Sequence, residues 1–520
     1  MFVSLSVQHL AKAVLVLGSA SLSMVREDPI GFTHKVGERF RQAGMSRLGK
    51  TLLSLDSHSE SAEGIRARVA TGELTTLPND AEPGLSRSDR RLIRRARERY
   101  ELLVRDFPTG GDANASRSSG GEATTQLRVG FLLNNSLPFT QSGYTLRSHM
   151  ILQALKKSGI SATAVTRLAY PLLVGKISLR DTTRIDGVEY YQLIPWVYPN
   201  TLPQRTDSSV TLMEHVLAPF NPSVIHTTTD YNNALVASRV AARLGIPWVY
   251  EVRGELEKTW LSRQPEDKKQ QAANSEFYTL ARAQETAAMQ AADAVVALSE
   301  VSKSKLVERG VAPNKIWVIP NAVDSVVLTA QIDKSKLRKE LEIDDRPTVG
   351  IVTSVVSYEG IDILLRAATF SGEYNVLIVG DGVETPRLKA LADELGITDR
   401  VKFVGRQPAD TIWKWYGCLD VFALPRKDEE VCRTVTPIKA LSAQALGIPV
   451  VASDLPAIRE ITGGLARYCR PEDPRELDEA VCRALAEPRN IADGRKWAQE
   501  HSWESNAARY EEMYRQIKAR

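Results

Sequence analysis

At 520 residues the chain is longer than one hydrophobic core usually supports, so its length predicts two or three domains. Its 67 basic and 63 acidic side chains leave a net charge of only +4, which argues against a general nucleic-acid binder. The four cysteines are scattered without C-x-x-C spacing, so neither a disulfide framework nor a zinc site is indicated. These features fit a protein of the reducing cytoplasm.

The N-terminus contains a short apolar run, Val14–Val25, preceded by Lys12. This run is shorter than the ~20 residues that a membrane-spanning helix needs, so we expect a buried or interfacial helix. A cleaved signal peptide is the alternative, although the residues before the apolar run are hardly basic.

Residues 1–106 lack strand alternation and predict a helical accessory region, and the Gly- and Ser-rich residues 107–126 predict a flexible linker. The segment Ser86–Val104 opens with capping residues and carries arginines around one face. It either packs by its apolar stripe or presents a cationic face to anionic lipid or a charged polymer. The stripe consists of Leu92, Ala96, Tyr100 and Leu103.

Beyond residue 126, strands alternate with helices, which is typical of parallel α/β layers. A first unit is predicted from strands at 127–134, 161–167, 224–226, 248–252 and 294–298, with helices at 144–157 and 275–292. A second unit is predicted from strands at 348–353, 374–380, 401–404, 421–424 and 449–452. A strand that ends at Pro320 joins the two units, and a last helix is expected at 502–517.

The segment Thr434–Asp454 reads as a polar loop, a helix, a tight turn and a buried strand. A loop that leads into a helix start directs free N–H groups and the positive end of the helix dipole toward one point, which suits a diphosphate. Lys439 would add a positive charge there. With its Thr-Val-Thr-Pro-Ile-Lys sequence, the segment resembles the donor-nucleotide loop of retaining, family 4 glycosyltransferases of the GT-B fold, in a branch found in exopolysaccharide clusters.

The resemblance implies an α/β protein with two Rossmann-like domains (GT-B) and an N-terminal helical extension. Residues 127–320 would form the acceptor domain, 321–500 the nucleotide-sugar donor domain, and 501–520 a helix that crosses back. The implied reaction moves a sugar from a nucleotide diphosphate sugar, the co-substrate, to a glycan, lipid-linked or small-molecule acceptor, with no metal or other cofactor. The implied place is the cytoplasm or its boundary at the inner face of the membrane, which residues 1–106 would contact.

The chain departs from the family pattern at a pair of glutamates that normally lie eight positions apart, where it has Thr434 and Ser442. The second of these glutamates normally binds the ribose hydroxyls of the donor. A different class of function therefore stays open, a GT-B-derived binding or scaffold protein that has lost transfer.

In the first unit, Asn135–His149 resembles the family's first glycine-bearing loop. Gly143 would let the backbone approach a ligand, and we predict that Gly143, Tyr144 and Arg147 bind the acceptor. His149 is a candidate catalytic residue, with an ordinary helix histidine as the alternative.

The strand at 248–252 ends in Arg253 and Glu257, at the edge where α/β sheets place ligands. Arg253 could hold an acceptor group or a donor phosphate, Glu257 could accept hydrogen bonds from sugar hydroxyls, and both are predicted to be catalytic. The alternative is a mutual surface salt bridge between the two side chains.

In the second unit, relatives often have a lysine before the glycine that is Gly360 here, but this chain has Glu359. The positive charge for a phosphate then needs another source among the arginines and Lys439. Gly380-Asp-Gly382 is a weak dinucleotide signal and is better interpreted as a turn facing the cleft. The predicted donor-binding residues are Ser354, Glu359, Arg406, Arg426, Arg433, Thr434, Val435, Thr436, Lys439 and Ser442.

Overall fold

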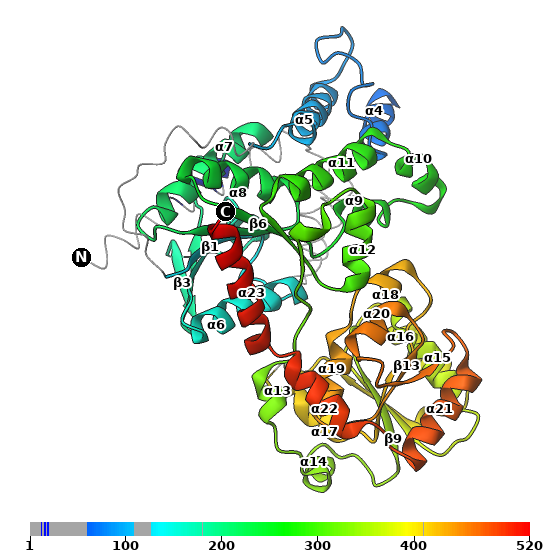
Figure 1. Cartoon of the computed structure of the whole chain (residues 1–520). Coiled ribbons are helices and arrows are strands. Elements are labelled where there is room, and N and C mark those ends of the chain that lie inside the picture. The colour runs from blue at the N-terminus through cyan, green and yellow to red at the C-terminus, as the bar shows by residue number, and fades with distance from the viewer. Residues whose placement is uncertain are drawn as a thin grey trace. The chain divides into compact units, whose positions relative to one another are not determined.

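The structure, a computed structural model, describes residues 12, 15, 16, 18, 19, 60–108, 126–178, 180–408 and 410–520 (Figure 1). It divides into two compact units. The first takes the described residues up to Val296, with Arg309–Ile316 and Glu511–Arg520. The second takes Ala297–Glu308 and Trp317–Tyr510.

The first unit is built on a sheet in the order β3-β4-β2-β1-β5-β6-β7-β8. The pairs from β4 to β7 are parallel and β3 runs antiparallel to its neighbour β4, so the predicted parallel α/β layer is confirmed. The strands are β1 Arg128–Leu133, β2 Ser161–Thr166, β3 Thr182–Ile185, β4 Val188–Gln192, β5 Val224–Thr228, β6 Trp248–Glu251, β7 Ala294–Ala297 and β8 Ile316–Val318.

Several helices of this unit start at residues whose side chains cap them. The Asp230 carboxylate accepts a hydrogen bond from Asn232 N at 3.0 Å and starts α8, which ends at the left-handed Gly245 with φ 64°. The helices are α4 Glu60–Ala70, α5 Arg87–Leu103, α6 Gly143–Lys157, α7 Leu202–Leu217, α8 Tyr231–Leu244, α9 Leu256–Leu261, α10 Lys269–Ala273 and α11 Glu276–Ala291, with short 3-10 turns at Leu172–Val174, Glu266–Lys268 and Pro313–Lys315.

The second unit has a sheet in the order β11-β10-β9-β12-β13-β14, in which every pair is parallel. Alternate residues of each strand enter different cores, because successive side chains of a strand point to opposite faces. In β10, for example, Val376 and Ile378 face one core and Leu377 and Val379 face the other. The strands are β9 Thr348–Val352, β10 Asn375–Val379, β11 Val401–Gly405, β12 Val421–Leu424, β13 Val450–Ser453 and β14 Arg467–Cys469.

Helices cover both faces of this second sheet. One core takes residues of α15, α16 and α21, and the other takes residues of α17, α19, α20 and α22. The helices are α12 Glu300–Glu308, α13 Ser325–Thr329, α14 Lys334–Glu340, α15 Ile361–Ala367, α16 Thr385–Glu394, α17 Ile412–Gly417, α18 Glu430–Thr434, α19 Ile438–Ala445, α20 Pro456–Ile461, α21 Pro474–Ala486 and α22 Ile491–Glu500, with 3-10 turns at Ser357–Glu359 and Thr398–Arg400.

The last helix, α23 Trp503–Lys518, begins in the second unit and ends in the first, as the sequence predicts for a crossing helix. Within the first unit its Tyr514 hydroxyl lies 2.7 Å from Nδ1 of the buried His226. None of the helices that the structure describes combines the length and the apolar character that a membrane crossing requires.

The glycines of Gly380-Asp-Gly382 serve packing between neighbouring loops. A Cβ on Gly380 would lie 1.7 Å from Thr353 O, and one on Gly382 would lie 2.1 Å from Val355 O. The loop after β10 therefore lies directly on the backbone of the loop after β9. This contact accounts for both glycines without a dinucleotide.

The described part of the N-terminal extension packs on the first unit through α5, which contacts α4, α7 and α11. Ser86 begins α5 with a capping box. Ala96 and Leu103 of the predicted stripe are buried, whereas Leu92 and Tyr100 are only partly buried and Ile93 and Leu102 are buried instead. Phe107, which the sequence assigns to the linker, is buried and stacks on Trp248 at 6.2 Å. The rest of the predicted linker, 109–125, and most of Val14–Val25 lie outside the described residues.

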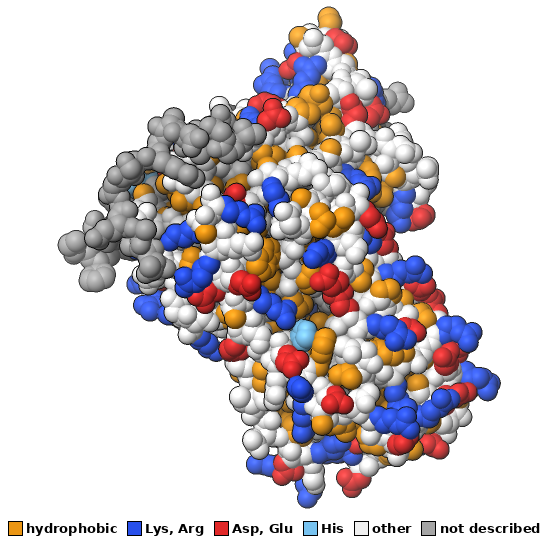
Figure 2. All heavy atoms as spheres, in the orientation of Figure 1, with side chains coloured by type: hydrophobic (Ala, Val, Ile, Leu, Met, Phe, Trp, Pro, Cys, Tyr) orange, Lys and Arg blue, Asp and Glu red, His pale blue; other side chains and the backbone are white. Residues whose placement is uncertain are grey.

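Arginines of α5 and of the residues just after it have acidic partners within the protein. Arg95 pairs with Glu98 at 2.6 Å, Arg97 pairs with Asp80 at 2.9 Å, and Arg105 pairs with Glu101 at 2.6 Å. Figure 2 shows basic and acidic side chains mixed over α4 and α5 at the top of the view. This mixture supports packing of the helix by its apolar stripe, the first of the two predicted alternatives.

We predict that Leu103→Ala, at the buried end of α5, lowers the free energy of unfolding of the first unit by about 2–4 kcal/mol, because it leaves a cavity where this buried side chain packs. Val104→Ala is the matched control, since Val104 is 45% exposed, and its effect should stay within about 0.5 kcal/mol. Urea unfolding of the full chain measures both. Equal midpoints for the two variants would contradict the packing of α5 on this unit.

Candidate functional site

A cavity of about 190 Å³ lies at the carboxyl ends of β1, β5 and β6 in the first unit, where parallel sheets place ligands. Its walls come from the loops after these strands and from the start of α6 and of α9. Residues in its lining include Asn135, Tyr144, Ser148, Asp230, Arg253 and Thr259.

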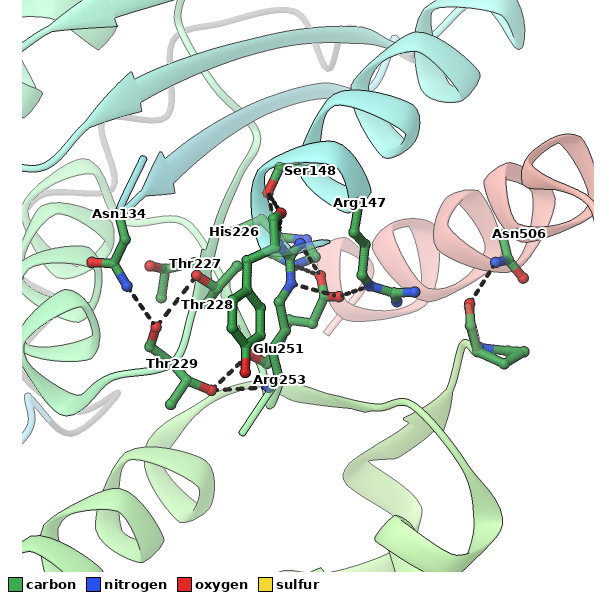
Figure 3. A network of polar contacts seen from close by, with 12 residues as sticks. Asn134, Arg147, Ser148, His226, Thr227, Thr228, Thr229, Glu251, Arg253 and Asn506 are labelled. Carbon is green, nitrogen blue, oxygen red and sulfur yellow. Dashed lines mark hydrogen bonds and ion pairs between the residues drawn. The ribbon is translucent and has the colours of Figure 1, made fainter. Parts of the chain in front are cut away.

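Beside this cavity the fully buried Glu251, at the end of β6, holds three partners from different elements (Figure 3). Arg147 on α6 donates from Nε to Glu251 Oε1 at 2.7 Å, and Arg253 donates to Oε1 at 3.0 Å and to Oε2 at 3.1 Å. His226 on β5 lies 3.1 Å from Oε2 through Nε2. The carboxylate thus connects α6, β5 and the loop after β6.

The charges in this network set its protonation. Burial tends to raise the pKa of the Glu251 carboxyl, but Arg253 and Arg147 outweigh burial and hold that pKa well below its ordinary value. Burial also lowers the pKa of His226, so its imidazole is neutral at pH 7. The network is therefore a carboxylate shared by two guanidinium groups and a neutral histidine.

Arg253 uses most of its donors within the protein. Besides its two bonds to Glu251, Nη1 donates to Tyr144 O at 2.9 Å and to Ser148 Oγ at 2.6 Å. The alternative of an Arg253–Glu257 surface salt bridge is wrong, because Glu257 is buried and pairs instead with Arg309 at 3.1 Å. Leu256 and Thr259 of α9 line the cavity and Glu257 does not, because residues one apart point to different faces of a helix.

Of the other predicted site residues in the first unit, some line the cavity and some lie outside it. Tyr144, 59% exposed, lines the cavity one residue after Gly143, the first residue of α6. Arg147 is buried on Glu251 and lies outside the cavity lining. His149 also lies outside it, 2.7 Å from the Tyr190 hydroxyl and 3.0 Å from Asp186. Its predicted catalytic role has no geometric support here, and an ordinary helix histidine accounts for these contacts.

Glu285 on α11 is a functional candidate that the sequence analysis missed. It is buried, accepts a hydrogen bond from Tyr231 N at 2.7 Å and another from the Tyr250 hydroxyl. Burial and the nearby Asp230 raise the pKa of its carboxyl to about 8. A glutamate within an otherwise ordinary helix pattern gives no sequence signal, since only folding brings it to the strand ends.

In the second unit, Glu359 lies between two cations at the carboxyl ends of β9 and β12. Arg426 donates to it at 2.8 and 3.2 Å, and Lys439 at 2.8 Å. Gly360 allows this arrangement because it has φ 71° and because a Cβ there would lie 1.8 Å from Pro425 O. The loop after β9 can therefore approach the backbone just before Arg426.

Electrostatics again favours the ionised form of the carboxylate. Burial tends to raise the pKa of Glu359, but Lys439 and Arg426 lower it below its ordinary value. Burial lowers the pKa of Lys439, and Glu359 opposes this shift. Lys439 also donates to the Thr353 hydroxyl, and its side chain as a whole is 24% exposed.

Lys439 belongs to the first turn of α19, whose N-cap residue, Pro437, makes no side-chain capping bond. The first N–H groups of this helix thus have no cap within the described part of the chain. Two backbone carbonyls of the loop before it accept hydrogen bonds from side chains. Arg426 donates to Val435 O at 3.3 Å, and Asn321 donates to Thr436 O at 3.4 Å. Thr434 donates to Glu430 O at 2.9 Å.

The remaining predicted donor-binding residues form no hydrogen bond or ion pair with Glu359, Arg426 or Lys439 in the described part of the chain. Arg433 is exposed and pairs with Asp428 at 2.6 Å, so its charge is already balanced. Ser354 and Arg406 are exposed at two strand ends. Ser442, on α19, hydrogen-bonds the buried Tyr416. Among the described residues no group of three or more His, Cys, Asp or Glu side chains could hold a metal ion.

Two family models match the chain in succession. Residues 142–322 match a glycosyl transferase 4-like domain, and residues 346–487 match the glycosyl transferases group 1. The chain carries the two domains of a GT-B glycosyltransferase.

Curated relatives of this glycosyltransferase have different acceptors in their names. It is 28% identical over 279 residues to 2-deoxystreptamine glucosyltransferase of Streptomyces kanamyceticus, covering 51% of the chain and 69% of the relative. It is 34% identical over 214 residues to D-inositol 3-phosphate glycosyltransferase of Mycobacterium sp. (strain KMS), covering 40% of the chain. The match spans only 43% of the length of that second relative.

Solved structures support the same fold. Sucrose-phosphate synthase from Thermosynechococcus elongatus superposes with a TM-score of 0.59 at 21% identity, over 75% of the chain and 99% of that structure. The Anabaena protein HepE in complex with UDP superposes with a TM-score of 0.55 at 18% identity, over 75% of the chain and 100% of that structure. At these identities the likeness concerns the GT-B fold alone.

The glycosyltransferase should lose stability as pH rises from about 5 to about 8 because of Glu285. Its carboxyl ionises near pH ~4.3 when unfolded but keeps its proton to about pH 8 when folded. A folded pKa above the unfolded one gives stability that is complete below the unfolded pKa and is lost as pH rises through the folded pKa.

Glu285→Gln should flatten this fall, which urea unfolding at several pH values measures. Glu214→Gln is the control, since the Glu214 side chain is 37% exposed and pairs with Arg243 at 2.8 Å, and it should keep the wild-type profile. Parallel profiles for wild type and Glu285→Gln would show that Glu285 does not hold its proton.

Proposed function

We propose that this glycosyltransferase moves a sugar from a nucleotide diphosphate sugar to an acceptor hydroxyl with retention of configuration, as a family 4 enzyme of the exopolysaccharide branch. The observation that carries the proposal is the pair Arg426 and Lys439 around Glu359, at the uncapped start of α19. Such a start attracts diphosphate oxygens. HepE, which shares the fold, has also been solved with UDP-glucose.

In the proposed reaction the bond between the anomeric carbon and the diphosphate breaks, and a bond from that carbon to the acceptor oxygen forms. The acceptor proton leaves with the nucleotide diphosphate. Negative charge grows on the departing diphosphate, where Lys439 and the N–H groups of α19 would stabilise it. Glu359 would act as a positioning residue that fixes the directions of Arg426 and Lys439. These two cations would supply the positive charge that many relatives take from a lysine at the position of Glu359.

We further propose that the first unit holds the acceptor in the cavity beside Glu251. Tyr144 at its rim and Arg253 in its wall support this placement, with Glu251 orienting Arg253. The acceptor would be a glycan, lipid-linked or small-molecule hydroxyl compound in cell-surface glycoconjugate synthesis. A relative, the O-antigen biosynthesis glycosyltransferase WclY of Escherichia coli, is 26% identical over 181 residues.

We place the enzyme in the cytoplasm, where nucleotide sugars are made, and propose reversible contact with the inner face of the membrane through residues 1–106. Leu15 supports such contact because it is 53% exposed on a helical segment. The exposed Arg87 and Arg90 at the start of α5 would add attraction to anionic lipid.

The alternative is a binding or scaffold protein without transfer. Its support is that Thr434 and Ser442 replace the paired glutamates and that Ser442 is engaged with Tyr416. A panel of nucleotide sugars, screened by thermal shift and followed by turnover of the best binder, separates the two functions, since a scaffold would show no turnover.

We predict that Lys439→Ala weakens the binding of a nucleoside diphosphate by about 1–3 kcal/mol, because it removes a charge-assisted contact. Isothermal titration with UDP, GDP and ADP measures the effect. Lys414→Ala is the matched control, since Lys414 is 29% exposed and pairs with Glu340 within the same unit, and it should leave affinity unchanged. Equal affinity of Lys439→Ala and wild type would remove Lys439 from the donor site.

Ser442→Glu should strengthen binding of the donor by about 1 kcal/mol, because a carboxylate accepts ribose hydroxyl bonds more strongly than a serine hydroxyl does. Ser442→Gln is the control, with the same length and no charge, and should gain less. The measurement is titration with the best nucleotide sugar of the panel. If neither wild type nor Ser442→Glu binds any nucleotide sugar, the scaffold alternative is favoured.

A further inference from the structure

The charged side chains in the cavity of the first unit bear on which acceptors it can bind. Its lining contains one carboxylate, Asp230, and one guanidinium, Arg253. Asp230 uses Oδ1 to accept from the N and Nδ2 atoms of Asn232, at 3.0 and 3.1 Å. No side chain of the described residues pairs with its Oδ2, which leaves a carboxylate oxygen available to a ligand.

The positive charge of Arg253 is largely committed. Its Nε, Nη1 and Nη2 atoms make four hydrogen bonds to Glu251, Tyr144 O and Ser148 Oγ, which occupy four of its five N–H groups. Arg147 shares the same Glu251 carboxylate. The two guanidinium groups and one carboxylate leave a single positive charge, which the carboxylate of Asp230 balances.

The cavity contains a buried acceptor atom that is not satisfied within the described residues. Asn135 lines it, and its Oδ1 is buried without a hydrogen-bond partner among the described residues. A buried carbonyl oxygen without a donor costs free energy, which a ligand hydroxyl or ammonium would recover. A fully ionised phosphate has no hydrogen to donate to Asn135 and would be repelled by Asp230.

The size of the cavity indicates the ligand's size. Its volume of about 190 Å³ is below the ~300–1,000 Å³ of pockets for drug-sized ligands. It therefore suits one ring of a ligand rather than an extended chain.

We propose that this cavity binds a single hydroxyl-rich ring without a phosphate, prefers a ring that carries an amine, and uses Asp230 to set this preference. The inference rests on the proposed function for the role of that ring as the sugar acceptor. The charge preference itself rests on the cavity alone. Asp230 is thus a specificity-determining residue.

The test is isothermal titration of the full chain with three cyclitols of different charge, in the presence and absence of saturating UDP. The probes are 2-deoxystreptamine, which is cationic, myo-inositol, which is neutral, and D-inositol 3-phosphate, which is anionic. We expect affinity to fall in that order, with about tenfold between the first two, as one charge-assisted hydrogen bond would give.

Asp230→Asn keeps a good N-cap for α8 and removes the charge. The substitution should lower the affinity for 2-deoxystreptamine about tenfold, to the affinity for myo-inositol, and should not lower the affinity for D-inositol 3-phosphate. Asp207→Asn is the control, since Asp207 is a 56% exposed side chain on α7 that pairs with Arg239, and all three affinities should stay unchanged. Asn135→Leu is a second variant, and it should weaken all three cyclitols by similar factors.

The proposal is overturned if D-inositol 3-phosphate binds as tightly as myo-inositol, if Asp230→Asn leaves 2-deoxystreptamine affinity unchanged, or if no cyclitol binds at millimolar concentration. Failure of the proposed function has a different signature. In that case no nucleotide binds and no sugar is transferred, while the order of cyclitol affinities and its dependence on Asp230 persist.

Discussion

The buried carboxylate of Glu251 is the interaction on which the first unit's site depends. Two arginines cannot lie beside a protein core without a counter-charge, because a buried unpaired ion costs several kcal/mol. Glu251 supplies that charge and in doing so fixes the start of α6 and the loop after β6. His226 extends the network to Tyr514 on the last helix, so the end of the chain is tied to the same carboxylate. The polar network therefore helps to place the walls of the cavity.

The second unit repeats this physical solution with different residues. Glu359 is buried and shared by Arg426 and Lys439, again at the carboxyl ends of parallel strands. The two sites differ in how far their basic side chains are exposed. Arg253 is almost completely engaged, whereas Lys439 is 24% exposed at a helix start without a side-chain cap. This difference agrees with a donor diphosphate in the second unit and a ring without phosphate in the first.

Several elements could be predicted because their signals are local. The runs at β9, β10 and β12 are apolar and continuous, as strands buried on both faces are, and Ser86 marks the start of α5 through its capping box. The sequence analysis did not predict β3, β4 or β14. These are short strands with partly exposed residues, and a short run of mixed polarity is not separable from a loop by periodicity.

The sequence by itself determined the longer apolar strands, the division into two α/β units and the loop before α19, since each depends on neighbouring residues. Only the tertiary structure decided which charges meet. Arg253 pairs with Glu251 two residues away and not with Glu257, Glu359 meets an arginine 67 positions later, and Glu285 reaches the strand ends from the middle of a helix. The physical reason is that ion pairing depends on distance in space and on burial. Strand order and loop packing set both of these, and residue spacing along the chain does not.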